Sequence, residues 1–422
     1  LYCWGQGNRG QLGNNQTPGG DNPNPMPLKV GMDAWQSVCA MADATCGVKK
    51  NKEAFCWGHN ADGQIANGLD GYTFQATGTP SPILLGADQN QYAPLFCGGS
   101  TILAYNNDDL WGWGSNRMGT LANGQVGYDA SYPGGSATAY VPRLLNENKD
   151  NWPKFTNISI STVHACGISD EKELFCWGSY DMGQFGDGRR GDGFDKYSYR
   201  SQPLYSEYEK PVKINEFKWI DVASLSQNTC AVKDDGTLWC WGIAEWGIIG
   251  IGDVFASYTA GTPQDNATYT EAFQQLVTNG QCEEQFYSED KAASQKRRYP
   301  PVCTKPVQVG TASNWVSVSG SSNHVCAVNS SNELFCWGEN EYGQIGNGEK
   351  GDVYSTLPSN YDLVTSPYKI EGEFIAVSAG YNFTCAISLD KKLYCWGFSA
   401  LGIPGFTGNK DNPQTTPVKI SF

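Results

Sequence analysis

The chain has 422 residues, and its 29 Lys and Arg against 43 Asp and Glu give a net charge of −14. This charge excludes nucleic-acid phosphates and anionic membrane surfaces as main partners, because both are bound by an excess of Lys and Arg. An aromatic content of 13% and 50 glycines exclude a disordered chain and a coiled coil, and no run of about 18 apolar residues predicts a membrane span.

A short motif, an aromatic residue followed by Cys-Trp-Gly, recurs along the chain. Its copies stand at 2–5, 55–58, 175–178, 239–242, 335–338 and 394–397, and a seventh at 111–114 has Gly in place of Cys. In every copy a glycine follows six residues after the last Trp, and it usually opens a turn of the Gly-Gln-Leu/Ile-Gly type. Seven matches with the same internal spacing indicate a repeat architecture.

Two further segments accompany the motif. A Val-Ser-x-Gly-type segment lies upstream of six of the seven copies, as at 318–326 and 377–385, and a Thr-Pro or Lys-Pro segment precedes it, as at 305–309. Their β-branched and aromatic residues, bounded by Gly, Asn and Asp, predict strands. In 393–396 neither face of the strand is polar, so neighbours must cover both faces. We therefore predict an all-β fold, a seven-bladed β-propeller with about four antiparallel strands per blade.

These segments resemble a known family. The Val-Ser-x-Gly-x-x-His-x-Cys-Ala-Val strand and the Trp-Gly-x-Asn-x-x-Gly-Gln-Leu-Gly loop are similar to the regulator of chromosome condensation repeat, which forms seven-bladed propellers. The resemblance covers essentially the whole chain and implies one propeller domain over 1–422. The wide spacing between the fifth and sixth Cys-Trp-Gly-type motifs predicts a long loop insertion at about 253–305, and the six upstream strands for seven motifs predict an incomplete first blade. It implies no single function, since the family includes exchange factors for a small GTPase, chromatin-docking proteins, light sensors and enzyme inhibitors.

Ten cysteines form five pairs with nine residues between the partners. If Cys230 and Cys240 face each other, Lys233 pairs with Thr237 and leaves a three-residue turn with Gly236 where a positive φ is needed. Opposed strand residues lie within disulfide range. Buried free thiols and a zinc site are the alternatives, but the spacing fits no usual zinc motif. We predict the disulfides Cys46–Cys56, Cys166–Cys176, Cys230–Cys240, Cys326–Cys336 and Cys385–Cys395. In the third blade the two cysteine positions hold Ile102 and Gly112, so both cysteines are missing together, as a disulfide predicts.

Five cysteines remain. Cys282 and Cys303 lie in the long insertion and are expected to bond to each other. Cys39 and Cys97 stand at the Ser position of the innermost strand in neighbouring blades, where they either bridge the blades or stay free. Cys3 lacks a hairpin partner, which we expect ahead of Leu1. The chain thus reads as a processed or incomplete piece, with the absent hairpin supplied upstream or by another chain.

Asn-x-Ser/Thr sequons predict N-linked glycans at Asn266, Asn329 and Asn382. Asn329 lies at a hairpin turn and Asn266 in the insertion, so both are expected to be exposed. Asn15 is followed by Pro18, which disfavours modification, and Asn157 enters an inner strand, which leaves its burial open. Glycans and disulfides together predict the secretory pathway and an extracellular or cell-surface location.

No catalytic motif, metal cluster or cofactor site is expected, and His164 and His324 occupy a repeat position that favours a structural hydrogen bond. The sequence predicts a non-catalytic extracellular propeller that binds other extracellular proteins or copies of itself. Tyr197, Tyr199, Tyr205 and Tyr208, in a long connection, are candidate interface residues. The alternatives are a secreted enzyme inhibitor, a glycan-binding module and, last, an intracellular GTPase exchange factor.

Overall fold

The computed structural model describes most of the chain. The described residues are 1–15, 24–41, 43–68, 77–83, 93–123, 138–147, 152–190, 210–257, 268–286, 298–322, 324–351, 363–398 and 413–421. No helix among them is long and apolar enough to cross a membrane.

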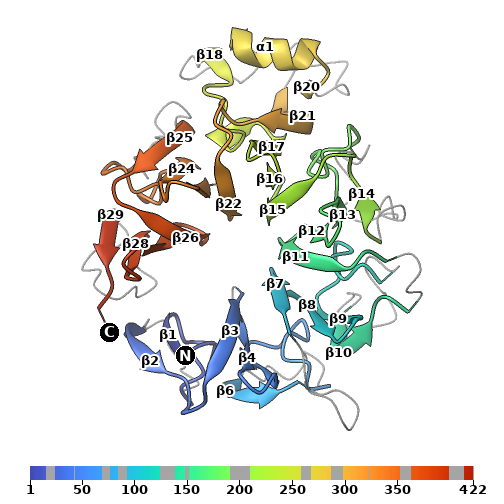
Figure 1. Ribbon diagram of the computed structural model, residues 1–422, viewed down its shortest axis with the longest axis vertical. Helices are drawn as coiled ribbons and strands as arrows, with labels where there is room; N and C mark the ends of the chain where they lie inside the picture. The colour runs from blue at the N-terminus through green and yellow to red at the C-terminus, as the bar shows by residue number, and fades with distance from the viewer. Residues whose placement is uncertain are drawn as a thin grey trace, which may run out of the picture.

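The strands form antiparallel sheets arranged radially in a ring, so the fold is a β-propeller with six full blades and one partial blade (Figure 1). Blade 1 holds β1 (Tyr2–Gly5) and β2 (Asn24–Lys29). Blade 2 holds β3 (Trp35–Ala40), β4 (Ala44–Lys49), β5 (Ala54–Gly58) and β6 (Thr77–Pro82), and blade 3 holds β7 (Leu95–Gly98), β8 (Thr101–Asn106), β9 (Asp109–Gly114) and β10 (Ala139–Leu144).

The remaining blades follow in chain order around the ring. Blade 4 holds β11 (Phe155–Ile160), β12 (His164–Ser169), β13 (Leu174–Gly178) and β14 (Val212–Lys213). Blade 5 holds β15 (Trp219–Ser224), β16 (Asn228–Lys233), β17 (Leu238–Ile243), β21 (Arg298–Gln308) and β20 (Cys282–Phe286). Blade 6 holds β22 (Trp315–Gly320), β23 (His324–Asn329), β24 (Leu334–Gly338) and β25 (Val364–Ile370), and blade 7 holds β26 (Phe374–Ala379), β27 (Phe383–Ser388), β28 (Leu393–Gly397) and β29 (Gln414–Lys419).

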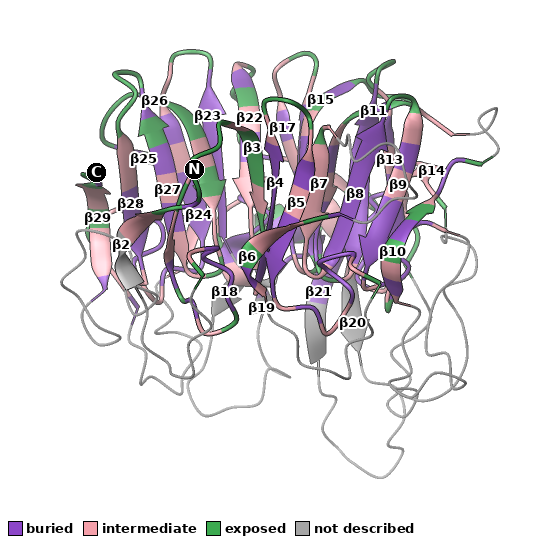
Figure 2. Ribbon diagram, turned by 90° about the horizontal axis from the view of Figure 1, so that it is seen from below, coloured by how far each residue is buried: buried purple, intermediate pink, exposed green. Residues whose placement is uncertain are grey.

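The second and third strands of a blade form the predicted hairpin. In blade 5 Cys230 lies opposite Cys240, Lys233 donates its backbone N–H to the Thr237 carbonyl over 2.9 Å, and Gly236 has φ +80°. Asn332 takes this turn position in blade 6 with φ +60°. The second and third strands of blades 2 to 6 are largely buried, while exposed residues lie at the turns and on inner strands such as β3 and β26 (Figure 2).

The insertion at about 253–305 contains regular structure, whereas the sequence predicted a loop. It begins after a short 3-10 turn (Glu245–Gly247) and holds the two-stranded pair β18 (Phe255–Ser257) and β19 (Thr268–Tyr269), the helix α1 (Glu271–Thr278) and β20. The hydroxyl of Thr270 caps α1 by accepting from the Phe273 amide, and the ring of Phe273 is fully buried. Because β20 pairs with the long β21, the insertion extends blade 5 by a fifth strand.

Each of blades 2 to 7 is joined to the blade before it through the Trp of the repeat. The buried indole of Trp396 donates to the backbone carbonyl of Gln344, which belongs to the Gly-Gln loop of blade 6, over 2.9 Å. The same bond recurs from Trp57 to Gln11, Trp113 to Gln64, Trp177 to Thr120, Trp241 to Gln184 and Trp337 to Ile248, at 2.8 to 3.1 Å. The two sequence motifs are therefore the two halves of one inter-blade contact.

Blade 3 differs from the alignment that the sequence suggested. Its hairpin has a two-residue turn, and Leu103 rather than Ile102 lies opposite Gly112. The shorter turn shifts β8 by one residue. On the innermost strand, Cys97 lies opposite Ile102, so it matches Ala40 of blade 2 and not Cys39.

Blade 1 shows two strands in the described part of the chain, and the surfaces that face it are unusually open. Val38 of blade 2 is 49% exposed, whereas its counterparts Val222 and Val318 are 4% and 7% exposed. Ile387 of blade 7 is 40% exposed, whereas Val328 is 1% exposed. The predicted seven-blade ring is thus present as six complete blades and this partial one.

Candidate interaction surface

The two repeat histidines are structural. His164 and His324 are fully buried, and each Nε2 lies 2.8 Å from a Thr hydroxyl of the next blade, Thr229 and Thr384 respectively. Burial lowers the pKa of His164 to about 3 and that of His324 to about 4, so both imidazoles are neutral at physiological pH. Among the described residues, no group of three or more His, Cys, Asp or Glu is arranged to hold a metal ion.

In the structure, the two cysteines of each of five hairpins are bonded to each other. The sulfurs of the five hairpin pairs are 2.05 to 2.12 Å apart, and the Cα atoms of each pair are 4.1 Å apart. Cys282 and Cys303 join β20 to β21. Cys39 and Cys97 join blades 2 and 3, with their Cα atoms 6.0 Å apart.

Cys3 is a half-buried free thiol within the described part of the chain. It lies on β1 opposite Leu28 of β2, and burial raises the pKa of the thiol to about 11. A thiol of that pKa is almost wholly protonated at neutral pH, which makes it a poor nucleophile.

The five sequons fall in different environments. Asn382 is half-buried in the turn before β27, and Asn15 is exposed at a loop. Asn157 is half-buried, and its amide donates to Asp221 over 2.8 Å. Asn266 lies outside the described residues, as do the interface candidates Tyr197, Tyr199, Tyr205 and Tyr208.

The expectation that Asn329 is exposed was wrong. Its side chain is only 4% exposed, because it folds back over the hairpin turn. Its Oδ1 accepts from the backbone amides of Ser331 and Glu333 over 3.0 Å each, and its Nδ2 donates to the Glu333 carboxylate over 2.7 Å. This local bonding is typical of Asn at a turn, and it competes with solvent exposure of the amide.

An exposed apolar arc stands out at the inner strands of blades 5 to 7. It consists of Ile220, Val316 and Ile375, which are 40%, 45% and 44% exposed. In each strand this residue is the second, at a register shift between the first and third residues. A β-bulge leaves its extra residue unpaired and turns the side chain away from the ladder. Figure 1 shows these three strands, β15, β22 and β26, next to one another around the centre of the ring.

The bulge recurs in other blades, but its exposed residue there is polar. Gln36 of blade 2 and Thr156 of blade 4 are exposed at the same register shift. The arc is therefore specific to blades 5 to 7. Sequence reasoning missed it because an aliphatic residue in a strand is expected to be buried. The sequence did contain one signal. The apolar residues Trp219, Ile220 and Val222 do not follow the strict alternation between two faces that a regular strand shows.

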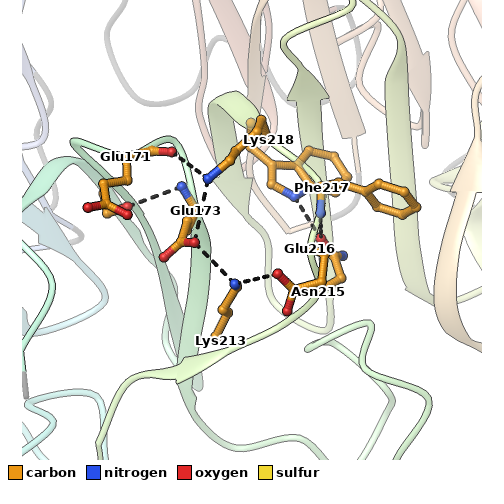
Figure 3. A network of polar contacts seen from close by, with 9 residues as sticks. Glu171, Glu173, Lys213, Asn215, Glu216, Phe217 and Lys218 are labelled. Carbon is orange, nitrogen blue, oxygen red and sulfur yellow. Dashed lines mark hydrogen bonds and ion pairs between the residues drawn. The ribbon is translucent and has the colours of Figure 1, made fainter.

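A charged network lies where the connection from blade 4 enters blade 5, just before Ile220 in the chain (Figure 3). Glu173, in the hairpin turn of blade 4, lies 3.1 Å from Lys213 Nζ and 3.5 Å from Lys218 Nζ. The ammonium of Lys213 holds the pKa of Glu173 below its usual value. Phe217, in the connection to blade 5, is 49% exposed, and Lys233 Nζ lies 4.5 Å from its ring centre.

Such exposed ion pairs add little to stability. An apolar centre bordered by charged groups is the usual composition of a protein-binding surface. We call Phe217, Ile220, Val316 and Ile375 the apolar surface.

Comparison with protein families identifies the repeat. The model of the Regulator of chromosome condensation (RCC1) repeat matches residues 1–49 and 331–387, and a second model of the same repeat matches 315–344 and 374–402. The chain is 25% identical to the Ultraviolet-B receptor UVR8 of Arabidopsis thaliana over 374 residues, which is 87% of this chain and 65% of that protein. It is 26% identical to the mitochondrial RCC1 domain-containing protein RUG3 of the same plant, over 58% of this chain and 50% of that protein.

Solved structures agree in fold. Prp20p of Saccharomyces cerevisiae, described with its binding to Gsp1p and histones, superposes with a TM-score of 0.68 at 17% identity, covering 100% of this chain and 85% of that one. Human WBSCR16 superposes with a TM-score of 0.66, also at 17% identity, covering 100% of this chain and 93% of that one.

Proposed function

Because this chain is a propeller built of regulator of chromosome condensation repeats, we propose that it is a non-catalytic, extracellular protein-interaction subunit. The observation that carries the proposal is the set of seven disulfides, since such bonds persist in oxidising compartments and are rare in the cytosol. The apolar surface supports binding of another protein, and partners would be extracellular proteins or further copies of the chain.

The compartment is tested on the protein purified from its native source. Free thiols are alkylated during lysis, and peptides are mapped without reduction. Extracellular function predicts cystine-linked peptides for all seven pairs and a glycan on Asn382, which is half-buried in the turn before β27 and, unlike Asn15, has no proline after its sequon. If all 15 cysteines are alkylated without a reductant, the protein is kept reduced and the proposal fails.

The binding surface is tested by a triple variant, Ile220→Thr, Val316→Thr and Ile375→Thr. Threonine occupies this bulge position in blade 4, as Thr156, so the fold accommodates the change. A partner bound by the wild-type chain should be lost from the variant. Val141→Thr, on β10 of blade 3, changes a residue that is 40% exposed elsewhere and should leave binding intact. Equal binding by the triple variant would contradict this surface.

A second candidate is binding of a small GTPase inside the cell. It is favoured by the shared fold with Prp20p, which was described with its binding to Gsp1p. The same peptide map separates the two candidates, because an intracellular exchange factor would carry reduced cysteines.

A further inference from the structure

One disulfide differs in kind from the others. Six of the seven bonds join strands of one blade, whereas Cys39 of β3 and Cys97 of β7 join blade 2 to blade 3. Cys39 also lies opposite Cys46, but Cys46 is bonded to Cys56 on its other side. A residue of a central strand that pairs at the close spacing with the strand on one side pairs at the wide spacing with the strand on its other side. The Cα atoms of Cys46 and Cys56 are 4.1 Å apart, which is the close spacing. Cys39 therefore faces Cys46 at the wide spacing, which favours its bond to the next blade.

At two other junctions, the corresponding residues of neighbouring blades are joined by a hydrogen bond and not by a covalent bond. Between blades 4 and 5, the hydroxyl oxygen of Ser159 accepts from the backbone amide of Ser224 over 2.8 Å. Between blades 6 and 7, the hydroxyl oxygen of Ser319 accepts from the amide of Ala379 over 3.0 Å. Ser159 and Ser319 lie opposite the hairpin cysteines of their blades, as Cys39 does.

The residues on the donor side of these hydrogen bonds, in the following blade, match as well. Ser224, Ala379 and Cys97 each lie opposite the residue that pairs with the repeat Trp. The Cys39–Cys97 bond thus replaces a hydrogen bond that is sufficient at two other junctions. Breaking it should leave a junction that can still close.

The bond is also the most accessible of the seven. Cys39 and Cys97 are both half-buried. In every other pair at least one partner is fully buried, and Cys385 is the sole half-buried cysteine among those twelve. Thiol–disulfide exchange requires an attacking thiolate to reach one of the two sulfurs, so access sets which bond reacts first.

We propose that Cys39–Cys97 is a site of reversible thiol–disulfide exchange with small solvent thiols, which opens the junction between blades 2 and 3 while the propeller stays folded. A thiolate of a small dithiol attacks one sulfur, the protein S–S bond breaks, and its electron pair passes to the other cysteine. The second thiol of the reagent then displaces the mixed disulfide. The protein gains two thiols, and the reagent leaves as a cyclic disulfide.

The test is stepwise reduction of the folded chain with dithiothreitol. Cys3 is first alkylated with one reagent, the protein is reduced for increasing times, and new thiols are trapped with an isotopically distinct reagent and located by peptide mass spectrometry. The expected result is a first species with two new labels, on Cys39 and Cys97, followed by labels on Cys385 and Cys395. Oxidised glutathione should restore the bond in the unlabelled first species.

Two further readings make the result decisive. In the two-label species, amide hydrogen exchange should rise in 35–40 and 95–98 and stay unchanged in 155–160 and 219–224. The control variant Cys39→Ser with Cys97→Ser should fold and lack the first labelling phase, because the introduced hydroxyl at 39 can accept from the backbone amide at 97. The proposal is overturned if Cys46 or any other fully buried pair is labelled as early as Cys39 and Cys97, or if the first reduction unfolds the chain.

Discussion

His324 of blade 6 donates its Nε2 proton to the hydroxyl oxygen of Thr384 of blade 7, over 2.8 Å. The direction follows from Thr384, whose single hydroxyl proton goes to the carbonyl of Gln344, also over 2.8 Å. That carbonyl additionally accepts the indole N–H of Trp396. The same arrangement links His164, Thr229, Gln184 and Trp241 between blades 4 and 5. The histidine is therefore a neutral donor in a buried inter-blade chain of hydrogen bonds.

Replacing Thr384 by Val should lower the free energy of unfolding by about 1–3 kcal/mol, because the buried His324 N–H would lose its acceptor. The isosteric side chain fits this position, since Val325 occupies it in blade 6 opposite Trp337. Thr384→Ser keeps the hydroxyl and should stay closer to the wild type. Urea denaturation at pH 7.5 measures both variants, and equal stability of the Val variant and the wild type would refute the role of this bond.

Stability should fall as the pH drops below 6.5, the unfolded-state pKa of histidine. The folded-state pKa values are about 3 for His164 and about 4 for His324, so between pH 6.5 and 4 the unfolded chain binds protons that the folded chain does not. Each buried histidine then contributes a loss of about 1.4 kcal/mol per pH unit. Above pH 6.5 both histidines are neutral in both states and the loss vanishes.

The control for this slope is the double variant His164→Asn and His324→Asn. Asn228 occupies the same position in blade 5 and donates to the carbonyls of Trp241 and Ile243. Denaturation of both proteins at a series of pH values should give a shallower acid dependence for the double variant. All other groups titrate alike in both proteins, so identical slopes would contradict the assignment.

Asp221 connects three blades at the inner ring. Its carboxylate accepts from the amide of Asn157 in blade 4 and from the backbone amide of Val318 in blade 6, both over 2.8 Å. Asp221→Ala should lower the free energy of unfolding at pH 7.5 by roughly 2 kcal/mol, because two donors lose a charged acceptor. Ser37→Ala changes the equivalent but exposed position of blade 2 and should stay within about 0.5 kcal/mol of the wild type. Chemical denaturation of the two variants decides the point, and equal effects would argue against the bridge.

Burial raises the pKa of Asp221 to about 6, against the effect of its hydrogen bonds. The folded-state pKa therefore lies above the usual 3.8, and the stability that its protonation contributes is present below pH 3.8 and is lost as the pH rises through 6. This trend opposes that of the histidines. The free energy of unfolding should accordingly fall more steeply with decreasing pH in Asp221→Ala than in the wild type, and the same series of denaturation measurements tests this.

Gly242, the last residue of the repeat motif in blade 5, has φ +108°, and an added Cβ would meet the backbone carbonyl of Gln227. Gly242→Ala should therefore cost about 1–2 kcal/mol for the backbone conformation and a further 1–3 kcal/mol for the clash. Gly252, with φ +90°, has no atom nearer than 3.9 Å to an added Cβ. Gly252→Ala isolates the conformational cost, and thermal unfolding that places both variants at the same midpoint would contradict the clash.

The sequence by itself determined the propeller and, in the five hairpins that carry two cysteines, the register that places these cysteines opposite each other. In blade 3, where the turn is shorter, the register expected from the sequence was off by one residue. Five of the motif copies carry their strand pairing locally: a three-residue turn sets which residues oppose each other, as the turn with Gly236 does for Cys230 and Cys240. Residues that are close in the chain are brought together by that local geometry, so their relation can be read from spacing alone.

Only the tertiary structure decided how the blades meet. Three features depend on how neighbouring blades are placed relative to each other. They are the hydrogen bond from Trp396 to Gln344, the disulfide between Cys39 and Cys97, and the exposure of Ile220, Val316 and Ile375. The burial of Asn329 depends on the path of its own turn. Spacing specifies contacts within a hairpin, but contacts between sheets are set by the packing of side chains from segments about 60 residues apart, which no local pattern encodes.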